Sequence, residues 1–256
     1  MTDRIDKKKQ YVLSIVVPAY NEEFNLEPTI ETIFKVNEKV NHIIKILIIN
    51  DGSADNTQLE ANMIASKYVN VRVLHHKFPK GLGTIFNTAL ILSEGDYFCL
   101  IPGDNQISEE YIYELFQKAG EADVVLSYPK NPEIRARKRR LFSKTFVFIY
   151  NSLFGLKLKY YNGPAIFDLN KLRSIDMSTR FFSYHAEYVI RFIKYGYNYK
   201  EIGGVLKERK HGRSTALSWL SLLGVLFGTF LVFIDIYYFR RELYCKKSER
   251  INAAIL

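Results

Sequence analysis

The stretch Phe98-Cys-Leu-Ile-Pro-Gly-Asp-Asn-Gln106 joins a strand-like apolar run to a turn that carries a carboxylate and an amide. Residues 96–101 are apolar and aromatic enough for a strand covered on both faces, and Pro102-Gly103 ends it. Ligands of open α/β sheets collect at the carboxyl ends of strands, and oxygen ligands suit Mg²⁺ or Mn²⁺ shared with phosphate better than zinc. Asp104 and Gln106 are therefore predicted to hold a metal beside a diphosphate, with an ordinary turn as the alternative for this stretch alone.

The elements that must position this turn alternate along the first half of the chain. Short apolar runs predict strands at 13–17, 43–49, 71–74, 96–101 and 124–126. Helical spacing of apolar residues predicts helices around 26–34, over 55–68, from 81 to 90 and over 109–119. In the second of these helices, Leu59, Met63 and Ile64 are expected to face inward. Four such alternations predict a mostly parallel α/β sheet with helices on both faces.

Polar residues follow each of the first four predicted strands: Glu22, Asp51 with Asp55, Lys80 with Gly81, and Asp104. Loops of this kind converge on one crevice. Asp51 is placed to accept hydrogen bonds from a nucleobase or ribose. The stretch Lys80-Gly81-Leu82-Gly83-Thr84 offers backbone N–H groups at the start of a helix, which suits phosphate. For Asp51 and Asp55, turn and N-cap chemistry is the alternative interpretation.

Three segments together resemble a known family. Val16-Val-Pro-Ala-Tyr-Asn-Glu-Glu23, Asn50-Asp-Gly-Ser-Ala-Asp-Asn-Thr57 and Gly81-Leu-Gly83, with the acidic motif at the strand end, resemble the family-2 inverting glycosyltransferases of the GT-A fold. The likeness is greatest to polyprenyl-phosphate sugar transferases similar to dolichyl-phosphate mannose synthase, and it runs through residues 12–215. It implies that Asp104 and Gln106 hold the metal that bridges the donor diphosphate. The donor-binding residues expected from the motifs and the resemblance are Pro18, Ala19, Tyr20, Glu22, Asp51, Lys80, Gly81, Asp104 and Asn105.

One position departs from the family pattern. Pro102 stands where the family usually has the first acidic residue of an Asp-X-Asp motif. Losing that carboxylate weakens metal affinity, so a homologue that binds nucleotide sugars without transferring them is an alternative.

A basic segment begins the second half of the chain. Residues 130–144 contain seven basic residues against one acidic residue, Glu133, and an aromatic run, 146–150, follows directly. Such a segment can lie at an anionic bilayer and hold a lipid phosphate, or it can be a solvated helix that packs its apolar end on the core. We treat 130–160 as an interfacial insertion. The resemblance implies an acceptor-phosphate site made of Arg135, Arg139, Arg140 and Ser143.

Further catalytic residues are carried over from the family to later segments. Asn162–Asp168 resembles the strand beneath the sugar, and a helix that begins near Phe182 and ends near Tyr195 would place Glu187 near the sugar or acceptor. The stretch 208–214 resembles a basic loop that closes over the phosphates, with Ser214 among its candidates. The predicted catalytic residues are Asp104, Glu187, Arg209 and His211.

Leu217 to Phe239 is an apolar stretch of 23 residues with Asp235 as its only charge. This length can span a bilayer with tilt, but the stretch also contains hydroxyl side chains, and basic residues flank both of its ends. A helix lying in the interface, or one packed in a homo-oligomer through Gly224-X-X-X-Gly228, is an open alternative. We therefore expect residues 1–11 to be a polar segment, 12–215 the catalytic domain, and 216–256 a membrane-associated helix with a basic tail.

Composition narrows the class of protein. The 256 residues have a hydrophobic content of 48% and a formal net charge of +9, which indicates a large folded core and an anionic partner. Aromatic residues make up 14%, the basic residues cluster beside apolar runs, and no nucleic-acid motif is visible, so nucleic acid is not expected as the partner. Cys99 and Cys245 imply no disulfide framework, and the polar start of the chain shows no cleavable signal peptide. Together these features favour the cytoplasmic face of a membrane.

The resemblance implies a reaction. We expect an inverting transfer from a UDP- or GDP-linked sugar to a membrane polyprenyl phosphate, assisted by Mg²⁺ or Mn²⁺. A phosphate acceptor is already ionised near neutral pH and needs positioning by arginines more than a general base. Transfer to a saccharide hydroxyl is the alternative reaction, and it would require a carboxylate base, for which Glu187 is the first candidate.

Overall fold

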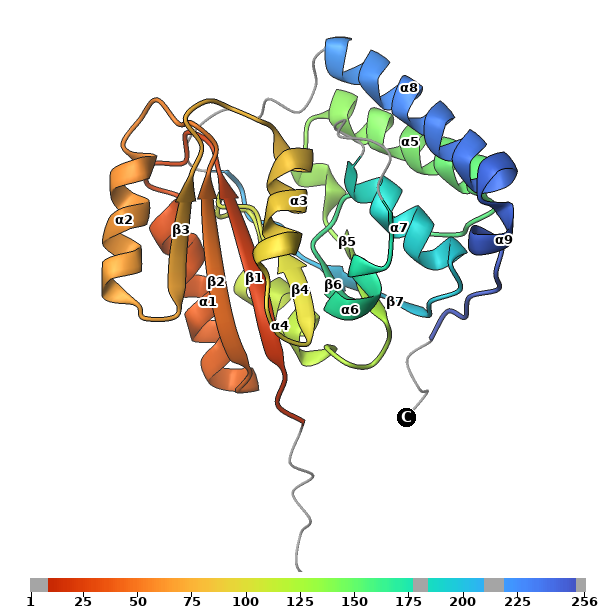
Figure 1. The fold of residues 1–256 in the computed structure, drawn as a ribbon. Coiled ribbons are helices and arrows are strands. Elements are labelled where there is room, and N and C mark those ends of the chain that lie inside the picture. The colour runs from red at the N-terminus through yellow and green to blue at the C-terminus, as the bar shows by residue number, and fades with distance from the viewer. Residues whose placement is uncertain (1–8, 177–183, 210–218, 252–256) are drawn as a thin grey trace, which may run out of the picture.

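The computed structural model describes residues 9–176, 184–209 and 219–251. Its centre is a seven-stranded sheet in the order β3-β2-β1-β4-β6-β5-β7 (Figure 1). The strands are β1 (Val12–Ala19), β2 (Ile43–Asn50), β3 (Val71–His75), β4 (Tyr97–Leu100), β5 (Val124–Pro129), β6 (Ala165–Asp168) and β7 (Tyr199–Gly204).

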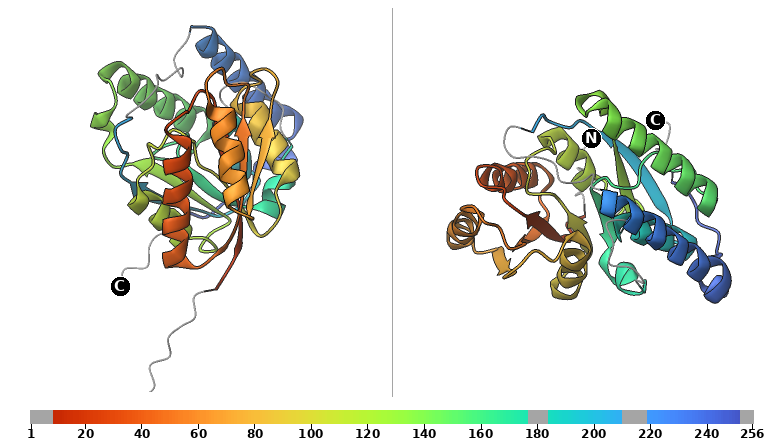
Figure 2. Two further views of the ribbon diagram at one scale, coloured as in Figure 1. Left: turned by 90° about the vertical axis from the view of Figure 1, so that its left-hand side faces the viewer. Right: turned by 90° about the horizontal axis from the view of Figure 1, so that it is seen from above.

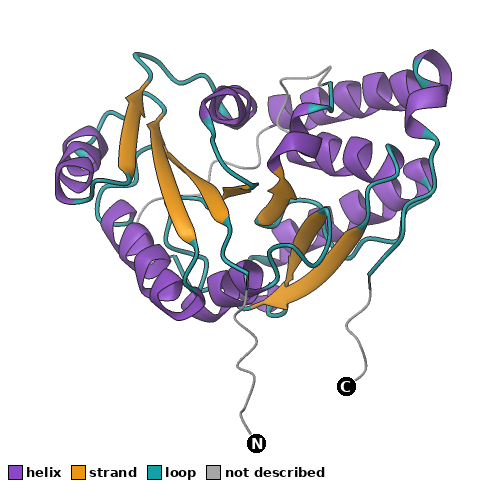
Figure 3. Cartoon of the chain, turned by 60° about the horizontal axis from the view of Figure 1, so that its bottom comes forward, coloured by secondary structure: helices purple, strands orange, loops and turns teal. Residues whose placement is uncertain are grey.

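Six of these strands run in one direction. β1 pairs in parallel with β2 and β4, β2 with β3, and β5 with β7, whereas β6 is antiparallel to both β4 and β5. The prediction of a mostly parallel α/β sheet is thus confirmed. The register pairs Ala19 with Asn50, so β1 and β2 end at the same level. The loops after these strands therefore open at one edge of the sheet, whose twist is visible in Figure 3.

Helices cover both faces of the sheet, as predicted (Figure 2). One buried cluster joins the sheet to α1, α2 and α4, and the other joins it to α3, α5, α7 and α8. Successive strand residues alternate between the clusters: Ile15 belongs to the first and Val16 to the second. The helices are α1 (Leu26–Val40), α2 (Thr57–Lys67), α3 (Leu82–Leu92), α4 (Glu109–Gln117), α5 (Arg137–Phe154), α6 (Leu169–Arg173), α7 (Tyr184–Lys194), α8 (Trp219–Ile234) and α9 (Arg241–Tyr244), with a 3₁₀ turn at Pro132–Ile134 and a π-helical turn at Asp235–Phe239.

The predicted inward face of α2 is partly wrong. Ile64 is buried, but Leu59 and Met63 are 60% and 63% exposed. The face that packs on the sheet is made by Thr57, Ala61 and Ile64, which are spaced by four and three residues. Leu59 and Met63 fall on the opposite side of the helix.

The C-terminal apolar stretch packs on the protein. Among the helices in the described part of the chain, none is both long enough and apolar enough to cross a membrane. Val232 in α8 and Ile236 in the π-helical turn belong to the buried core, beside Phe154 of α5. Beyond α9 the chain returns to the sheet: Tyr199 N–H donates to the Glu249 carbonyl over 3.0 Å, and Ile251 N–H donates to the Tyr199 carbonyl over 2.8 Å. This short segment therefore pairs with the outer edge of β7.

Candidate active site at the carboxyl edge of the sheet

The ends of β1, β2 and β4 are tied together by backbone hydrogen bonds. Asp51 N–H donates to the Ala19 carbonyl over 2.9 Å, and Gly103 N–H donates to the Pro18 carbonyl over 3.0 Å. A Cβ atom at Gly103 would lie 3.0 Å from that carbonyl oxygen, so the close approach favours glycine. Three of the loops that carry predicted donor-binding residues are thus brought to one place.

The loop after β1 is fastened to the loop after β2. Asn21 N–H donates to Ser53 Oγ over 2.9 Å, and Glu22 N–H donates to Thr57 Oγ1 over 2.8 Å. Asn21 has a φ of 54°, a left-handed conformation that asparagine tolerates. Tyr20 is 44% exposed beside these contacts. Side-chain hydrogen bonds therefore hold the predicted nucleoside-binding loop in place, and Tyr20 is accessible to solvent there.

The carboxylate of Asp51 has protein partners. Its oxygens accept hydrogen bonds from the backbone N–H groups of Lys80 and Gly81, each over 2.9 Å, and Oδ1 lies 2.7 Å from His76 Nδ1. Asp51 thus engages two of the N–H groups in the stretch 80–84, and phosphate binding by the rest of that stretch stays a prediction. His76 was not predicted, and its position at the end of β3 is the only sequence signal that pointed to it.

Arg209 pairs with Glu22, and Asp104 lies close enough to interact electrostatically with both, although the three residues are far apart in the sequence. Arg209 Nη2 lies 2.7 Å from Glu22 Oε1, and the other carboxylate oxygen of Glu22 accepts a hydrogen bond from Asn25 over 2.9 Å. Burial raises the pKa of Glu22, and the charge of Asp104 adds to this effect. Burial likewise raises the pKa of Asp104, whereas the charges of Arg209, Arg139 and Arg135 oppose that rise. These groups form one electrostatic unit.

The turn that carries Asp104 is held by a second basic residue. Gln106 N–H donates to Asp104 Oδ1 over 3.2 Å, and the Gln106 carbonyl accepts from Lys207 N–H over 2.8 Å. The Nζ atom of Lys207 donates to Asn105 Oδ1 over 2.7 Å. Lys207 was not predicted as a site residue, because nothing local in the sequence indicates that residues 206–209 run beside this turn.

The acidic side chains here suit a cation that is shared with a ligand. Within the described part of the chain, no group of three or more His, Cys, Asp or Glu residues could hold a metal ion. Mg²⁺ is usually held by one or two carboxylates together with substrate phosphates, and the partly buried carboxyl group of Asp104 fits that pattern. The role of Gln106 as a ligand stays a prediction.

A pocket of about 440 Å³ lies beside this edge, along α5. All four predicted acceptor-phosphate residues line it: Arg135, Arg139, Arg140 and Ser143. Lys144 and Lys159 add positive charge, while Val147 and Phe148 add apolar wall. Arg135 Nη1 donates to the Tyr160 hydroxyl over 2.7 Å, but its buried Nε has no hydrogen-bond partner among the described residues. Burial and the charge of Arg135 lower the pKa of Arg139.

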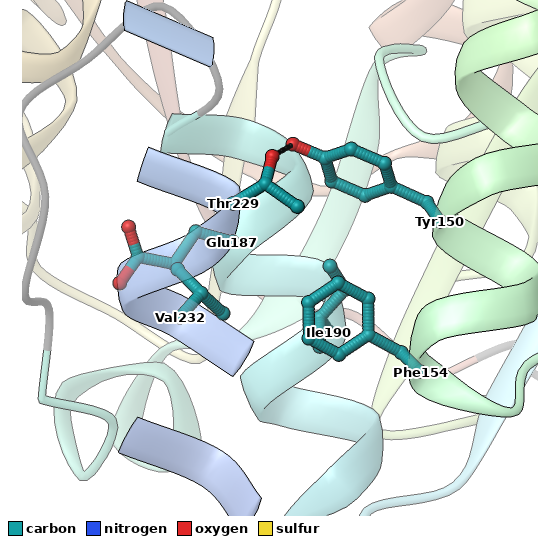
Figure 4. Close-up of a pocket in the computed structure, with 6 residues that line it drawn as sticks. All are labelled: Tyr150, Phe154, Glu187, Ile190, Thr229 and Val232. Carbon is teal, nitrogen blue, oxygen red and sulfur yellow. Dashed lines mark hydrogen bonds between the residues drawn. The ribbon is translucent and has the colours of Figure 1, made fainter. Parts of the chain in front are cut away.

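Glu187 does not line the pocket along α5 and is buried in an ion pair instead. It is 1% exposed, and its Oε1 lies 2.8 Å from Nε of Arg191, which is fully buried. Arg191 Nη1 also pairs with Asp235, so the three charges join α7 to the C-terminal π-helical turn. Figure 4 shows Glu187 among Tyr150, Phe154 and Thr229, with Tyr150 hydrogen-bonded to Thr229. This burial and the ion pair of Oε1 with Arg191 do not favour the catalytic role expected for Glu187, which stays an untested prediction.

Two predicted residues, His211 and Ser214, lie outside the described residues. Arg209 is the member of that basic loop that the structure places at the site.

Comparison with known proteins identifies relatives that act on sugars. The dolichol-phosphate mannosyltransferase of Saccharomyces cerevisiae is 24% identical over 173 residues, which cover 61% of this chain and 65% of that protein. The dolichyl-phosphate beta-glucosyltransferase ALG5D of Trichomonas vaginalis is 31% identical over 149 residues, 54% of this chain and 45% of the relative. The glycosyltransferase GlyG of Streptococcus pneumoniae is 31% identical over 117 residues, 45% of this chain and 38% of the relative. The chain thus covers less than two thirds of each.

Solved structures share the fold. The mannosyltransferase PcManGT from Pyrobaculum calidifontis, in complex with GDP-Man and Mn²⁺, has a TM-score of 0.60 at 14% identity, over 80% of this chain and 59% of that one. Glucosyl-3-phosphoglycerate synthase from Mycobacterium tuberculosis, in complex with Mn²⁺ and UDP-glucose, has a TM-score of 0.61 at 18% identity, over 87% and 79%. The GT-A-type α/β fold expected from the motifs is confirmed. Residues 14–184, more than half of the chain, match the family described as Glycosyl transferase family 2, so the chain belongs to that family.

Proposed function

We propose that this protein transfers a sugar, with inversion, from a nucleoside-diphosphate sugar to a polyprenyl phosphate at the cytoplasmic face of a membrane. The observation that carries the proposal is the pocket along α5. Arg135 and Arg139 line it and also act electrostatically on Asp104. Anion-binding groups and the expected metal-binding carboxylate therefore share one region, as a reaction between two phosphate-bearing substrates requires.

The acceptor end of the pocket is suited to a phosphate monoester with an apolar tail. The buried Arg135 Nε–H has no partner among the described residues, and an anion would satisfy it. Val147 and Phe148 lie in the same wall and would contact carbon atoms. The dolichol-phosphate mannosyltransferase of yeast and the dolichyl-phosphate glucosyltransferase of Trichomonas vaginalis support a lipid phosphate by their names.

The donor end is suited to a nucleotide sugar. Tyr20 lies exposed beside the fastened loops that follow β1 and β2, where a nucleoside would contact it. Proteins of the same fold were solved with GDP-Man or UDP-glucose and Mn²⁺, which supports a donor of this class and a divalent cation. Asp104, with Gln106 as the second candidate, would hold that cation. When bound, it would supply neutralisation of the charge that grows on the leaving diphosphate.

Residues of the chain itself would also stabilise the leaving diphosphate and orient the acceptor. Arg209 lies beside Glu22 and Asp104, where a guanidinium can also counter the leaving diphosphate. The arginines of the pocket would orient an acceptor that is already ionised, so no base is needed. A hydroxyl acceptor would need one, and the burial of Glu187, the first candidate, in an ion pair with Arg191 weighs against that role. This favours a phosphate acceptor. His211 remains a candidate for the same phosphate-binding loop as Arg209.

The test is release of nucleoside diphosphate from a panel of UDP- and GDP-sugars, with Mg²⁺ or Mn²⁺, in the presence and absence of polyprenyl phosphate. We expect release that requires one donor, the metal and the lipid phosphate together. Nucleotide binding without release from any donor would overturn the proposal in favour of a binding protein. Release that requires a saccharide acceptor instead would reject the lipid phosphate while keeping the enzyme class.

A further inference from the structure

Exposed hydrophobic side chains concentrate on two helices. Of the twenty large hydrophobic residues that are exposed in the described part of the chain, nine lie on α5, α8 and the π-helical turn after α8. We call these nine the docking face: Leu141, Phe142, Phe148, Ile149, Leu153, Phe227, Phe230, Tyr238 and Phe239. Scattered apolar residues need no explanation, but a group of this size on adjacent elements indicates a binding surface.

The two helices lie side by side and turn their apolar faces outward. Tyr150 of α5 hydrogen-bonds to Thr229 of α8, and the rings of Phe154 and Phe233 meet edge to face with centroids 6.2 Å apart. Figures 1 and 2 show both helices on the same outer side of the molecule. On α5 the buried Tyr150 and Phe154 face the core, so exposed neighbours such as Ile149 lie on the far side of the helix.

Positive charge adjoins the docking face. Arg137, Lys138 and Lys144 are exposed on α5, which contains no acidic residue. Arg241 and Lys246 are exposed just beyond the π-helical turn. Aromatic side chains with flanking Lys and Arg are the composition of helices that lie in the plane of an anionic bilayer surface.

We propose that the docking face binds the surface of a bilayer that contains anionic lipid, with α5 and α8 lying flat and neither crossing it. The Arg191–Asp235 pair holds the end of α8 to α7, so the helix is anchored in the protein. Phe148 belongs both to the docking face and to the wall of the pocket along α5. The pocket therefore opens at the depth of lipid headgroups. Delivery of a lipid phosphate to that pocket rests on the proposed function, whereas the docking itself does not.

Sedimentation of the full chain with vesicles tests the docking without any substrate. Vesicles of phosphatidylcholine alone are compared with vesicles that also contain phosphatidylglycerol. We expect binding that requires the anionic lipid and weakens with added salt. The doubly substituted variant Leu141→Ser/Phe230→Ser, with one change on each helix, should lose at least about tenfold in partitioning, because each exposed side chain gives up its apolar contact. Neither residue lines the pocket along α5.

The matched control is Leu59→Ser/Met63→Ser on α2, where both side chains are exposed to a similar extent, 60% and 63%. It should bind vesicles like the unsubstituted protein, and near-UV circular dichroism should show that both variants fold. Three results would overturn the docking: no vesicle binding by the unsubstituted chain, equal loss in the control, or a concentration-dependent dimer that the α5/α8 variant alone dissociates. Transfer to detergent-dispersed polyprenyl phosphate is measured alongside. Docking without transfer rejects the proposed function alone, and transfer without docking rejects the docking alone.

Discussion

Arg209 Nη2 lies 2.7 Å from Glu22 Oε1, although 187 positions separate the two residues in the chain. One follows the last strand of the sheet and the other follows the first. The pair lies near Asp104 at the carboxyl edge of the sheet. Burial raises the pKa of Asp104, and the charge of Arg209 opposes that rise. One guanidinium thus favours the ionised form of two carboxyl groups whose pKa values burial raises.

Replacing Arg209 by Ala should move the acid limb of the pH–rate profile to higher pH. Arg209 lowers the pKa of both Glu22 and Asp104, so its removal lets both values rise and more of each group stays protonated at a given pH. The measurement is kcat/KM across the acid range. Lys207→Ala is the control. It removes a positive charge that donates to the amide oxygen of Asn105 and is not among the main charges that lower the pKa of Glu22 or Asp104, so its acid limb should stay in place. An unmoved limb in the Arg209 variant would contradict the coupling.

Asp104→Asn should lower kcat by roughly 10²-fold or more while the protein stays folded. Burial raises the pKa of Asp104 in the folded state, which means that ionisation near neutral pH costs stability. The neutral amide keeps the oxygen that accepts from Gln106 N–H. We therefore expect a thermal midpoint equal to or above that of the unsubstituted protein. A variant that loses its fold together with activity would assign Asp104 to structure.

Arg135→Gln should raise the KM for polyprenyl phosphate by about tenfold or more, because losing a hydrogen bond between charged groups typically weakens binding by at least that factor. The KM for the donor should change little. Lys138→Gln is the matched control: it removes one positive charge from α5, but Lys138 is exposed and does not line the pocket. Equal effects of the two substitutions would indicate a general attraction to anions and reject a specific acceptor site.

Arg191→Met should destabilise the fold by roughly 3–5 kcal/mol, because it leaves Glu187 buried without its partner. Glu187→Gln should lower stability less and change kcat little. The free energy of unfolding is measured in urea and kcat from steady-state rates, for both variants. If Glu187→Gln abolished transfer while stability stayed the same, Glu187 would be the catalytic base of a hydroxyl-acceptor reaction, contrary to the proposal.

Stability should fall as the pH drops from about 6.5 to about 4, with His185 as one cause. His185 donates through Nδ1 to the Tyr161 carbonyl over 2.7 Å, and burial lowers its pKa to about 4. The unfolded chain, with an ordinary histidine pKa of about 6.5, binds a proton in this window that the folded chain does not. The contribution is therefore complete above the unfolded pKa and is lost towards the folded one, roughly 3 kcal/mol in all.

The histidine contribution can be isolated with His185→Asn, whose amide nitrogen can replace Nδ1 as donor. The variant should show a flatter dependence of unfolding free energy on pH between about 6.5 and 4. An identical slope in both proteins would assign the acid sensitivity to other groups.

Local signals predicted most of the fold and only part of the site. Alternating apolar runs and loops placed β1 to β5 and their helices, since periodicity is a property of neighbouring residues. The resemblance indicates a strand at 162–168, but the antiparallel direction of β6 and its place between β4 and β5 depend on long connections that leave no local pattern. The outward turn of Leu59 and Met63 depends on which side of α2 meets the sheet.

The site shows the same division. The motif residues at the ends of β1, β2 and β4 could be predicted because each lies just after an apolar run. His76 on Asp51, and Lys207 on Asn105, could not, because each contact joins residues distant in sequence. Glu187 is predicted to be catalytic because its neighbours in the sequence do not show that it shares Arg191 with Asp235, which lies 48 positions further along the chain.

The return of residues 249–251 to Tyr199 has a consequence for solubility. β7 is the last strand on its side of the sheet, and an uncovered outer strand offers unpaired N–H and C=O groups to any other chain. The backbone hydrogen bonds between Tyr199 and residues 249–251 occupy part of that row. Those few residues therefore protect part of the β7 edge from pairing with another chain. A protein shortened before Glu249 would keep its active site but would associate through β7 at high concentration.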